Sequence, residues 1–292
     1  ASFEERKSAL LAIATALESS VEEIVAANNQ DMERGKASGL NSQLLDRLML
    51  NEARIKAIAG GTRKVAALPN PLGNVLRKRT LDNGLELTQV TVPFGVVGMV
   101  YEARPNVTVD AAVILIMSGN ATLLRGSSSA EKSNEVLVSV MRRALSTTSI
   151  SPEVLQLIPS HDRDTTRALL HARGKVDLVI PRGSAALIRM VVDESTVPTI
   201  ETGAGVCHVY VDEKADLNKA LPILINSKTH RPSVCNAAET LLVHQKVKDE
   251  FLPKALRELH NAGVKLHGDE PTLAVARELH IPIEKAVEES WS

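Results

Sequence analysis

The spacing of apolar residues predicts that the chain opens with helices. Between residues 3 and 27, apolar positions recur every three or four residues, which indicates one amphipathic helix. Shorter helical runs follow at residues 42–48 and 52–67, and Asn51 is placed to cap the second of them. We therefore predict a helical opening of three helices.

Two β-type runs, residues 74–80 and 85–92, come next and are joined through Asn83 and Gly84. Asn-Gly between two such runs is a strong hairpin signal, because both residues tolerate positive φ at a turn. The pattern predicts a β-hairpin over about residues 74–92.

Beyond residue 93, strand-type and helix-type patterns alternate. Such alternation indicates βαβ units, a parallel sheet and right-handed crossovers, so the predicted fold class is α/β. Functional side chains are expected directly after strands, because ligands of such sheets bind at the carboxyl ends of the strands. The strand-type runs cover residues 94–100, 121–124, 154–158, 176–180, 206–211 and 240–243, and the helical runs cover residues 109–117, 130–145, 162–171, 185–192, 217–228 and 247–262.

Composition narrows the class of protein. At 292 residues the chain is long enough for two domains, and 44% hydrophobic with 24% charged residues is typical of a soluble globular protein. A formal net charge of −1 and an aromatic content of 2% favour neither nucleic acid nor a membrane as a partner. Two cysteines fit a reducing compartment. With no signal peptide, bilayer-spanning run or metal-ligand spacing in the sequence, we expect a cytoplasmic protein without a metal site.

Cys235 draws attention because it lies in a polar connection between a helical run and a β-type run. Lys228, His230 and Arg231 come just before it, and nearby cations favour the thiolate, which is the nucleophilic form. The segment suggests a catalytic nucleophile, with an inert loop cysteine as the alternative. Cys207, by contrast, lies within an apolar strand-type run and is expected to pack there.

Arg125 ends a predicted strand, and Gly126, Ser127 and Ser128 lead from it into a helix. Free backbone N–H groups at such a turn suit a phosphate. NAD sites of this kind usually carry an acidic residue at the strand end, whereas Arg125 would suit the 2′-phosphate of NADP. The alternative for the serines is simple capping of the helix.

Other predicted strands end in residues of similar interest. Gly183 and Ser184 form a second Gly-Ser turn before a helix, with the same two interpretations. Asn106 either caps a helix or aims its amide at a ligand, and Arg104 either meets an anion or is solvated. Residues 201–205 read ETGAG and lack the third glycine of a dinucleotide fingerprint, so they are a weak signal for a phosphate loop.

A family resemblance extends over nearly the whole chain. The chain resembles the γ-glutamyl phosphate reductases, a family of the aldehyde dehydrogenase superfamily, in the segments PFGVVGMVYEARPNVTVD, GNATLLRGSSSAEKSN, DLVIPRGSAALIRMV, GVCHVYVDE and RPSVCNAAETLLVH. The resemblance implies an aldehyde-dehydrogenase-like α/β fold, with a Rossmann-type parallel-sheet NADP-binding domain over residues 1–206 and an α/β catalytic domain over residues 207–292. The hairpin at residues 74–92 falls where the family's oligomerisation hairpin begins, which implies a homo-oligomer.

The same resemblance assigns catalytic roles by position. Cys235 matches the family's nucleophile, and Asn106 matches an asparagine that helps to form the oxyanion hole. Glu201 falls near the general base of hydrolytic aldehyde dehydrogenases, although ETGAG replaces their ELGG. Arg104 and Arg231 are candidate anchors for the substrate on grounds of charge alone.

Cofactor contacts follow from the resemblance in the same way. Arg125 and Ser127, with the adjoining Gly126 and Ser128, match positions on the adenosine side of NADPH. The turn formed by residues 183 and 184 matches the positions near the cofactor's phosphates and nicotinamide.

The activity that the resemblance implies is NADPH-dependent reduction of L-glutamyl 5-phosphate to L-glutamate 5-semialdehyde and phosphate through a cysteine thioester, the second step of proline biosynthesis. An association with glutamate 5-kinase is compatible with it. Because the chain ends at Ser292, the resemblance implies a catalytic domain that is incomplete at its C-terminus. Two alternatives stay open: another superfamily enzyme that oxidises an aldehyde or forms an acyl-CoA, and a non-catalytic cofactor-binding or oligomerisation module.

Overall fold

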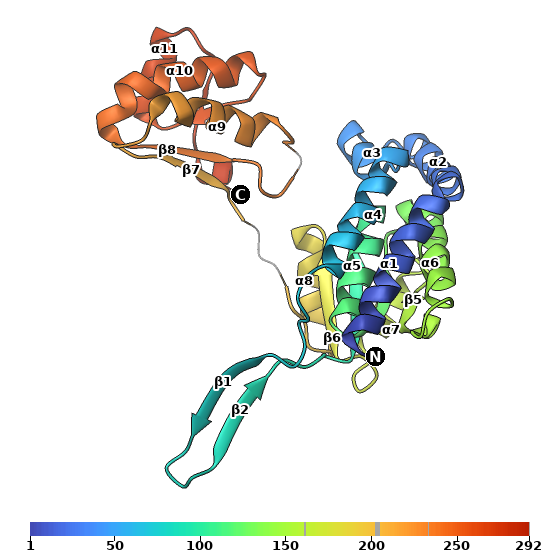
Figure 1. Ribbon diagram of the computed structural model, residues 1–292. Coiled ribbons are helices and arrows are strands. Elements are labelled where there is room, and N and C mark those ends of the chain that lie inside the picture. The colour runs from blue at the N-terminus through green and yellow to red at the C-terminus, as the bar shows by residue number, and fades with distance from the viewer. Residues whose placement is uncertain (161, 202–204, 233, 292) are drawn as a thin grey trace. The chain divides into compact units, whose positions relative to one another are not determined.

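The computed structural model describes residues 1–160, 162–201, 205–232 and 234–291 (Figure 1). The chain divides into two compact units, Ala1–Gly203 and Ala204–Ser292. The domain boundary predicted between residues 206 and 207 lies close to this division. Each unit has its own hydrophobic core, so each is described by itself.

The first unit is built on a four-stranded parallel sheet with the strand order β5-β4-β3-β6. The chain runs outward from β3 through β4 to β5 and then returns to β6 on the other side of β3. This reversal creates a switch point between β3 and β6, outside which ligands of open α/β sheets bind. The strands are β3 (Val96–Tyr101), β4 (Ala121–Arg125), β5 (Leu155–Leu157) and β6 (Leu178–Arg182).

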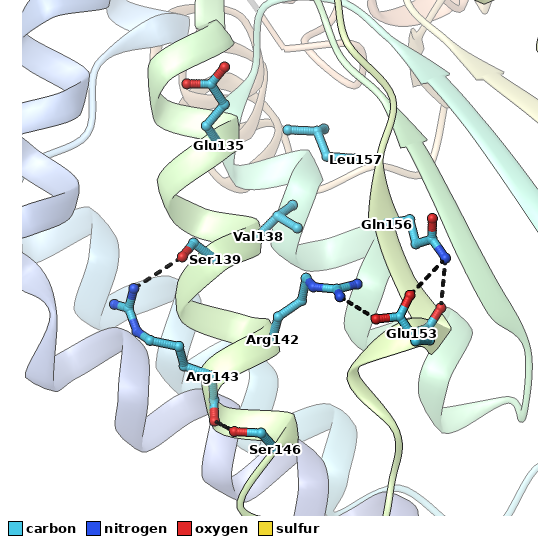
Figure 2. Close-up of a pocket in the computed structure, with 9 residues that line it drawn as sticks. All are labelled: Glu135, Val138, Ser139, Arg142, Arg143, Ser146, Glu153, Gln156 and Leu157. Atoms are coloured by element: carbon cyan, nitrogen blue, oxygen red, sulfur yellow. Dashed lines mark hydrogen bonds and ion pairs between the residues drawn. The ribbon is translucent and has the colours of Figure 1, made fainter.

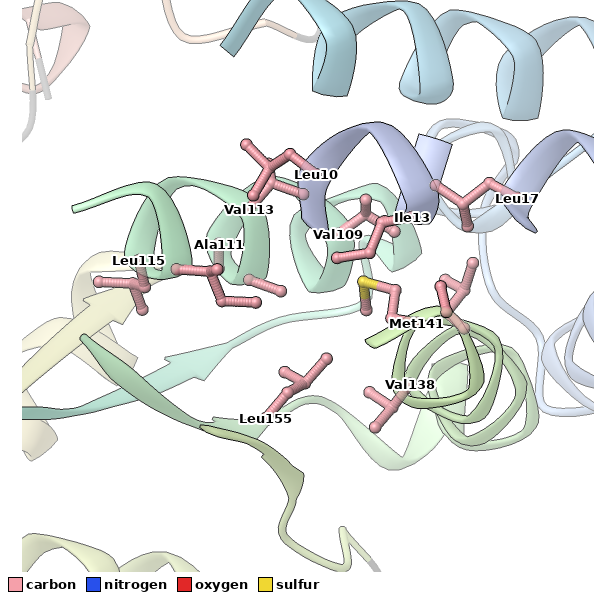
Figure 3. Close-up of a cluster of buried hydrophobic side chains, with 14 of the residues drawn as sticks. Leu10, Ile13, Leu17, Val109, Ala111, Val113, Leu115, Val138, Met141 and Leu155 are labelled. Atoms are coloured by element: carbon pink, nitrogen blue, oxygen red, sulfur yellow. The ribbon is translucent and has the colours of Figure 1, made fainter. Parts of the chain in front are cut away.

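Helices cover both faces of this sheet because successive strand side chains point to opposite faces. Val97 and Met99 of β3 join a large core with α5 (Pro105–Met117) and α6 (Glu131–Leu145). Figure 3 shows side chains that these two helices contribute to it, such as Val109 and Met141. Val100 joins a smaller core on the other face, with α7 (Arg163–Leu170) and α8 (Ala185–Glu194). Each fully buried aliphatic side chain in these cores contributes about 1.5–3 kcal/mol.

The opening of the chain forms four helices, not the three predicted. The single helix expected over residues 3–27 is wrong, because Ser20 ends one helix and begins the next. The Ser20 N–H bonds to the carbonyl of Leu17 three residues back, which breaks the regular helical ladder. The helices are α1 (Phe3–Ser19), α2 (Val21–Ala37), α3 (Ser42–Leu48) and α4 (Glu52–Ala66).

Capping explains where two helices begin. The Asn51 side chain accepts a hydrogen bond from Arg54 N, which confirms the predicted N-cap of α4. Helix α5 begins at Pro105, earlier than predicted, because proline is well suited to the first helical position. Asn106 therefore lies inside the first turn of α5 and does not precede the helix.

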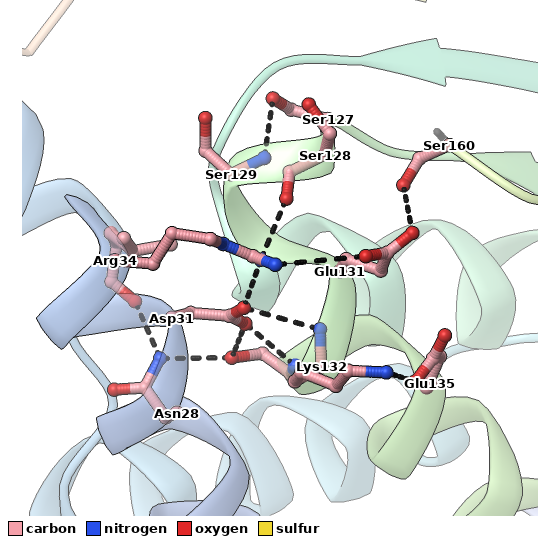
Figure 4. A network of polar contacts seen from close by, with 12 residues as sticks. Asn28, Asp31, Arg34, Ser127, Ser128, Ser129, Glu131, Lys132, Glu135 and Ser160 are labelled. Carbon is pink, nitrogen blue, oxygen red and sulfur yellow. Dashed lines mark hydrogen bonds and ion pairs between the residues drawn. The ribbon is translucent and has the colours of Figure 1, made fainter. Parts of the chain in front are cut away.

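A buried polar network joins α2 to the start of α6 (Figure 4). Asp31 of α2 is completely buried, and its carboxylate accepts hydrogen bonds from Ser133 N at 2.7 Å, Ser133 Oγ at 2.7 Å and Lys132 N at 3.2 Å. Arg34 donates at 2.6 Å to Oδ1, the carboxylate oxygen that also accepts from Lys132 N. The carboxylate satisfies N–H groups that the first turn of α6 leaves unpaired, and its charge complements the helix dipole.

The predicted hairpin is confirmed as β1 (Val75–Thr80) and β2 (Glu86–Val90), an antiparallel pair. Gly84 adopts a φ of 84° at the turn, where its missing Cβ avoids strain. Every residue of both strands is exposed, and apolar side chains such as Leu76 and Leu87 are 64% and 54% exposed. A two-stranded hairpin of this kind is marginal in water unless its apolar surface is covered.

The described residues of the second unit form two parallel pairs of strands and three α-helices. Two of these helices pack around Phe251, and the third packs in a separate small core with Leu252 and Leu256. The sequence analysis predicts the first four of its elements but none of the last three. They are β7 (His208–Val211), α9 (Leu217–Thr229), β8 (Thr240–Val243), α10 (Lys248–Asn261), β9 (His267–Gly268), α11 (Glu270–Glu278) and β10 (Glu284–Lys285). Across the described residues of both units, no helix is long and apolar enough to span a membrane.

The Asp31 network generates a prediction about stability. Asp31→Ala leaves the N–H groups of Lys132 and Ser133 without their acceptor inside the protein, so the free energy of unfolding should fall by about 2–4 kcal/mol. Asp46→Ala is the matched control, because Asp46 pairs with Arg54 at the surface and should cost less than about 1 kcal/mol. Urea unfolding followed by circular dichroism measures both, and equal losses would contradict the capping role.

Candidate functional site

The carboxyl edge of the parallel sheet brings together most of the predicted site residues. Because all four strands run the same way, the segments that follow them emerge along one edge. Residues 104–106 follow β3, residues 126–128 follow β4, and residues 183–184 follow β6. Residues 198–200 pair in parallel with β6 and bring Glu201 to the same edge, where it is exposed. Cys235 and Arg231 belong to the second unit.

A pocket of about 220 Å³ lies where β4 and β5 end and α6 begins. Gly126 is essential to its shape, since a Cβ there would lie 2.3 Å from Asn134 Nδ2 and 3.1 Å from the Tyr101 ring. Sequence reasoning identified Gly126 but missed the rest of the lining, which becomes visible only when β5 is placed beside β4. The other lining residues are Glu131, Asn134, Glu135, Leu157, Ile158, Pro159 and Ser160.

A larger hollow of about 660 Å³ lies between α6 and the edge strand β5 and shares Glu135 and Leu157 with that pocket (Figure 2). Both arginines of this hollow already have partners. Arg142 donates to Glu153 at 2.5 Å and to the carbonyls of Pro152 and Leu155. Arg143 donates to Glu23. Arg142 thereby covers the start of the edge strand β5. The polar groups here serve the fold, and the carboxyl edge remains the candidate site.

A series of buried hydrogen bonds lies beneath the carboxyl edge. Thr108 Oγ1 donates to Asn134 Oδ1 at 2.7 Å, so its single proton is used and the Tyr101 hydroxyl must donate to Thr108, also at 2.7 Å. Burial raises the pKa of Tyr101 well above its usual range, which keeps the phenol protonated and able to donate. These two hydrogen bonds link β3, α5 and α6 beneath the carboxyl edge of the sheet.

Arg125, at the end of β4, points along the strand ends toward β5. It donates to the carbonyl oxygens of Gly126 at 2.9 Å, Ser160 at 3.2 Å and Asp162 at 3.4 Å. Burial lowers the pKa of Arg125, an effect that Asp162 partly offsets, and guanidinium remains charged in proteins. Among the described residues none accepts a hydrogen bond from Arg125 Nε, which is buried, so this cation retains an unused donor.

Ser127, the first serine after β4, has a capping role in the structure. Ser127 Oγ accepts from Ser129 N at 3.2 Å and begins a short 3₁₀ turn. The N–H groups of Lys132 and Ser133, which could have received a phosphate, already bond to Asp31 (Figure 4). These contacts match the capping alternative, and contact of Ser127 and Ser128 with a cofactor stays a prediction.

The turn between β6 and α8 is held by a residue that the sequence analysis did not single out. Ser184 caps α8 through its Oγ, which accepts from Leu187 N, while Ser184 N donates to Glu102 Oε1 at 2.8 Å. A Cβ on Gly183 would lie 2.6 Å from both Cγ and Cδ of Glu102. Glu102 follows β3 directly, so it ties together the two strands that flank the switch point. Its only sequence signal is its place at a strand end.

Asn106 is the second residue of α5, and its Nδ2 donates to Asp110 Oδ2 at 3.0 Å. Burial raises the pKa of Asp110 above its ordinary value, and the hydrogen bond from Asn106 offsets part of that rise. Arg104 occupies the N-cap position of α5, with its backbone N–H bonded to Glu102 O at 2.7 Å. Arg104 and Asn106 thus share the amino end of one helix.

In the second unit, Cys235 lies in the connection between α9 and β8, where it is exposed. An exposed thiol is accessible to a substrate, which is one of the conditions for a nucleophile. Cys207 lies just before β7, not within the strand as predicted, and its Sγ donates to the carbonyl of Cys235 at 3.4 Å. Arg231 follows the end of α9 and is exposed. Residues 202–204 of the ETGAG segment and Ser233 lie outside the described residues.

No cluster of three or more His, Cys, Asp or Glu side chains that could hold a metal occurs among the residues that the structure describes. The described residues of the carboxyl edge and of the cysteine connection offer a thiol, an amide, arginines and the carboxylates of Glu102 and Glu201.

Comparison with known proteins identifies the fold. The model of the aldehyde dehydrogenase family matches residues 1–275. The chain is 54% identical over 287 residues to the γ-glutamyl phosphate reductase of Kineococcus radiotolerans, covering 98% of this chain and 66% of that protein. It is also 54% identical over 284 residues to that of Thermobifida fusca, covering 97% and 67%. The chain thus spans about two thirds of the length of these curated relatives.

A solved structure agrees with these relatives. The crystal structure of the γ-glutamyl phosphate reductase of Thermotoga maritima matches with a TM-score of 0.89 at 42% identity, covering 100% of this chain and 69% of that one. A propionaldehyde dehydrogenase of Clostridium phytofermentans, at 15% identity and a TM-score of 0.65, shares the fold. The predicted aldehyde-dehydrogenase-like α/β fold is confirmed.

The pocket yields a prediction about glycine. Gly126→Ala should lower the free energy of unfolding by about 1–3 kcal/mol, because the new Cβ would overlap Asn134 in a packed site. Gly60→Ala is the control: no heavy atom lies within 4 Å of a Cβ at this helical position, and alanine there should stabilise by about 0.5–1 kcal/mol. Chemical denaturation measures both changes, and a neutral Gly126→Ala would show that the pocket can adjust.

Proposed function

The chain belongs to the aldehyde dehydrogenase family, and from this premise we propose that it reduces L-glutamyl 5-phosphate to L-glutamate 5-semialdehyde and phosphate, with NADPH as the reductant. The observation that carries the proposal is the identity of 51–54% with proteins named γ-glutamyl phosphate reductase over nearly the whole chain. The exposed thiol of Cys235, in the segment that resembles the nucleophile segment of those proteins, supplies the chemistry.

In the proposed reaction, the Cys235 thiolate attacks the acyl carbon of the substrate. The carbonyl oxygen becomes an oxyanion, for which the Asn106 amide and the Cys235 backbone N–H are the assigned donors. One such donor typically contributes about 10²–10³ in rate. The oxyanion then re-forms the carbonyl, the bond between the acyl carbon and the phosphate oxygen breaks, and phosphate leaves with that electron pair. The product of this half-reaction is a thioester on Cys235.

The first unit fits a dinucleotide phosphate. Its sheet has the strand order and switch point of dinucleotide-binding folds, a pocket lies at the carboxyl edge, and Arg125 has a buried, unused Nε donor there. We assign Arg125, Gly126, Ser127 and Ser128 to the adenosine side, and Gly183 and Ser184 to the phosphates. NADPH would supply the hydride that reduces the thioester. Cys235 then leaves as the thiolate, and the aldehyde is released.

Other residues receive narrower roles in the proposal. Arg104 and Arg231 are assigned to anionic groups of the substrate, which carries a phosphate and an α-carboxylate. Glu201 is not required as a base, because the acyl phosphate already contains its leaving group and no water is activated. The first unit is then the cofactor domain, and the second unit, which holds Cys235, is the catalytic domain.

The proposal includes an assembly and a location. The hairpin β1–β2 exposes apolar side chains on paired strands, which supports a homo-oligomer formed through this element. The composition and the cysteine usage support a cytoplasmic location. Glutamate 5-kinase makes the proposed acyl phosphate, so an association with it would deliver an unstable substrate directly.

The decisive experiment runs the reaction backwards, following NADP⁺ reduction by glutamate 5-semialdehyde with and without phosphate. We expect NADPH formation that requires phosphate, because phosphate must release the acyl group from the thioester. Cys235→Ala should abolish turnover and leave NADPH affinity unchanged, while Cys207→Ala, the matched control, should keep most of the activity.

Either of two results would contradict the proposal. Phosphate-independent oxidation would indicate water as the acceptor and return Glu201 to the role of base. Cofactor binding without any turnover would indicate a non-catalytic module.

Arg125 provides a separate test of cofactor choice. Arg125→Gln should weaken the binding of NADPH at least about 10-fold more than the binding of NADH, since an ion pair to the phosphate contributes more than 1.4 kcal/mol to the binding free energy. Loss of the carbonyl contacts of Arg125 would affect both cofactors alike, so the ratio of the two dissociation constants isolates the 2′-phosphate. Fluorescence titration measures both, with Arg143→Gln in α6 as the control. Equal weakening of NADPH and NADH binding would contradict the assignment of Arg125 to the 2′-phosphate.

A further inference from the structure

The side chain of Asn106 is held by a neighbour that none of the sequence patterns singled out. Asn106 and Asp110 are one turn apart on α5, and side chains four residues apart lie on the same side of a helix. Asn106 Nδ2 donates to Asp110 Oδ2 at 3.0 Å. The contact lies in the first turns of α5, which begin where β3 reaches the carboxyl edge of the sheet.

This hydrogen bond determines which end of the amide faces Asp110. The carboxylate oxygen can only accept, so the NH₂ group of Asn106 faces it and the amide oxygen Oδ1 faces away. Nδ2 carries two hydrogens, and the bond to Asp110 uses one of them. The second hydrogen remains available to another acceptor, in an orientation fixed by the first.

The orientation of the amide matters for an oxyanion. The last torsion of an asparagine side chain is soft and roughly two-fold, so an unrestrained amide presents either its NH₂ group or its oxygen. An amide oxygen placed against a developing negative charge would repel it, whereas an N–H would stabilise it. With Asp110 present, the flipped amide would set Oδ1 against the carboxylate and is disfavoured.

Resting on the proposed function, we propose that Asp110 is a positioning residue that holds the Asn106 amide with its NH₂ group available to the oxyanion. Asp110 does not touch the reacting atoms in this role. It acts as a hydrogen-bond acceptor, so asparagine, which can turn its own Oδ1 toward the Asn106 NH₂ group, can replace it in part.

The test compares Asp110→Ala with Asp110→Asn in the phosphate-dependent assay. Asp110→Ala should lower kcat about 10-fold, because the amide is free to flip, and should leave KM and the NADPH dissociation constant unchanged. Asp110→Asn keeps an acceptor oxygen and should retain at least about half of kcat. Asp193→Ala, which removes an exposed aspartate from α8, should leave all three values unchanged. Equal losses in the two Asp110 variants, or no loss in either, would overturn the proposal.

A second readout does not depend on turnover. With asparagine labelled by ¹⁵N, the side-chain NH₂ signals of Asn106 are identified by their absence in Asn106→Ala. Asp110→Ala should move both proton signals toward the positions of an unrestrained amide, whereas Asp110→Asn should leave them near their original positions. Unmoved signals in Asp110→Ala would overturn the proposed orientation even in a protein without phosphate-dependent activity, and that lack of activity would by itself refute only the proposed function.

Discussion

The structure of the first unit depends on one buried carboxylate at the start of α6. Asp31 comes from the opening helices, yet it satisfies the first N–H groups of a helix that follows the second strand of the sheet. An ionised group with no exposed surface is tolerable only because every side of it meets a donor. The position of α6, and with it one wall of the pocket at the strand ends, is therefore set by a segment about a hundred residues away in sequence.

A second carboxylate accepts a hydrogen bond from the start of a helix at the switch point of the sheet. Glu102 places its carboxylate on Ser184 N, as Asp31 does on Ser133 N. Two helix starts at the carboxyl edge are thus held by acidic side chains of the protein itself. The edge is organised before any ligand arrives, which would suit the proposed site, where a thioester and a nicotinamide have to meet with little freedom.

Local patterns predicted the elements whose signals are local. The turn at Gly84, the cap at Asn51 and the alternation of strands and helices beyond residue 93 all rest on neighbouring residues, and the structure contains them. The break at Ser20 was missed because the apolar spacing continues across it. Asp31 and Glu102 were missed because their partners are distant in sequence, and no spacing within one segment shows that a carboxylate will meet a particular N–H group. The roles of Cys235 and Asn106 came from family resemblance, since a cysteine in a loop carries no more than a hint of chemistry.

Assembly of two copies through the exposed hairpin, as proposed, would make the stability of this segment depend on the protein concentration. Its strands bond to each other, but their apolar side chains have no cover within the described part of the chain. If a second copy supplies that cover, mass action makes the order of this segment rise with the amount of protein in solution. Dilution would then loosen the hairpin while the sheet and its helices, which bury their own cores, stay folded.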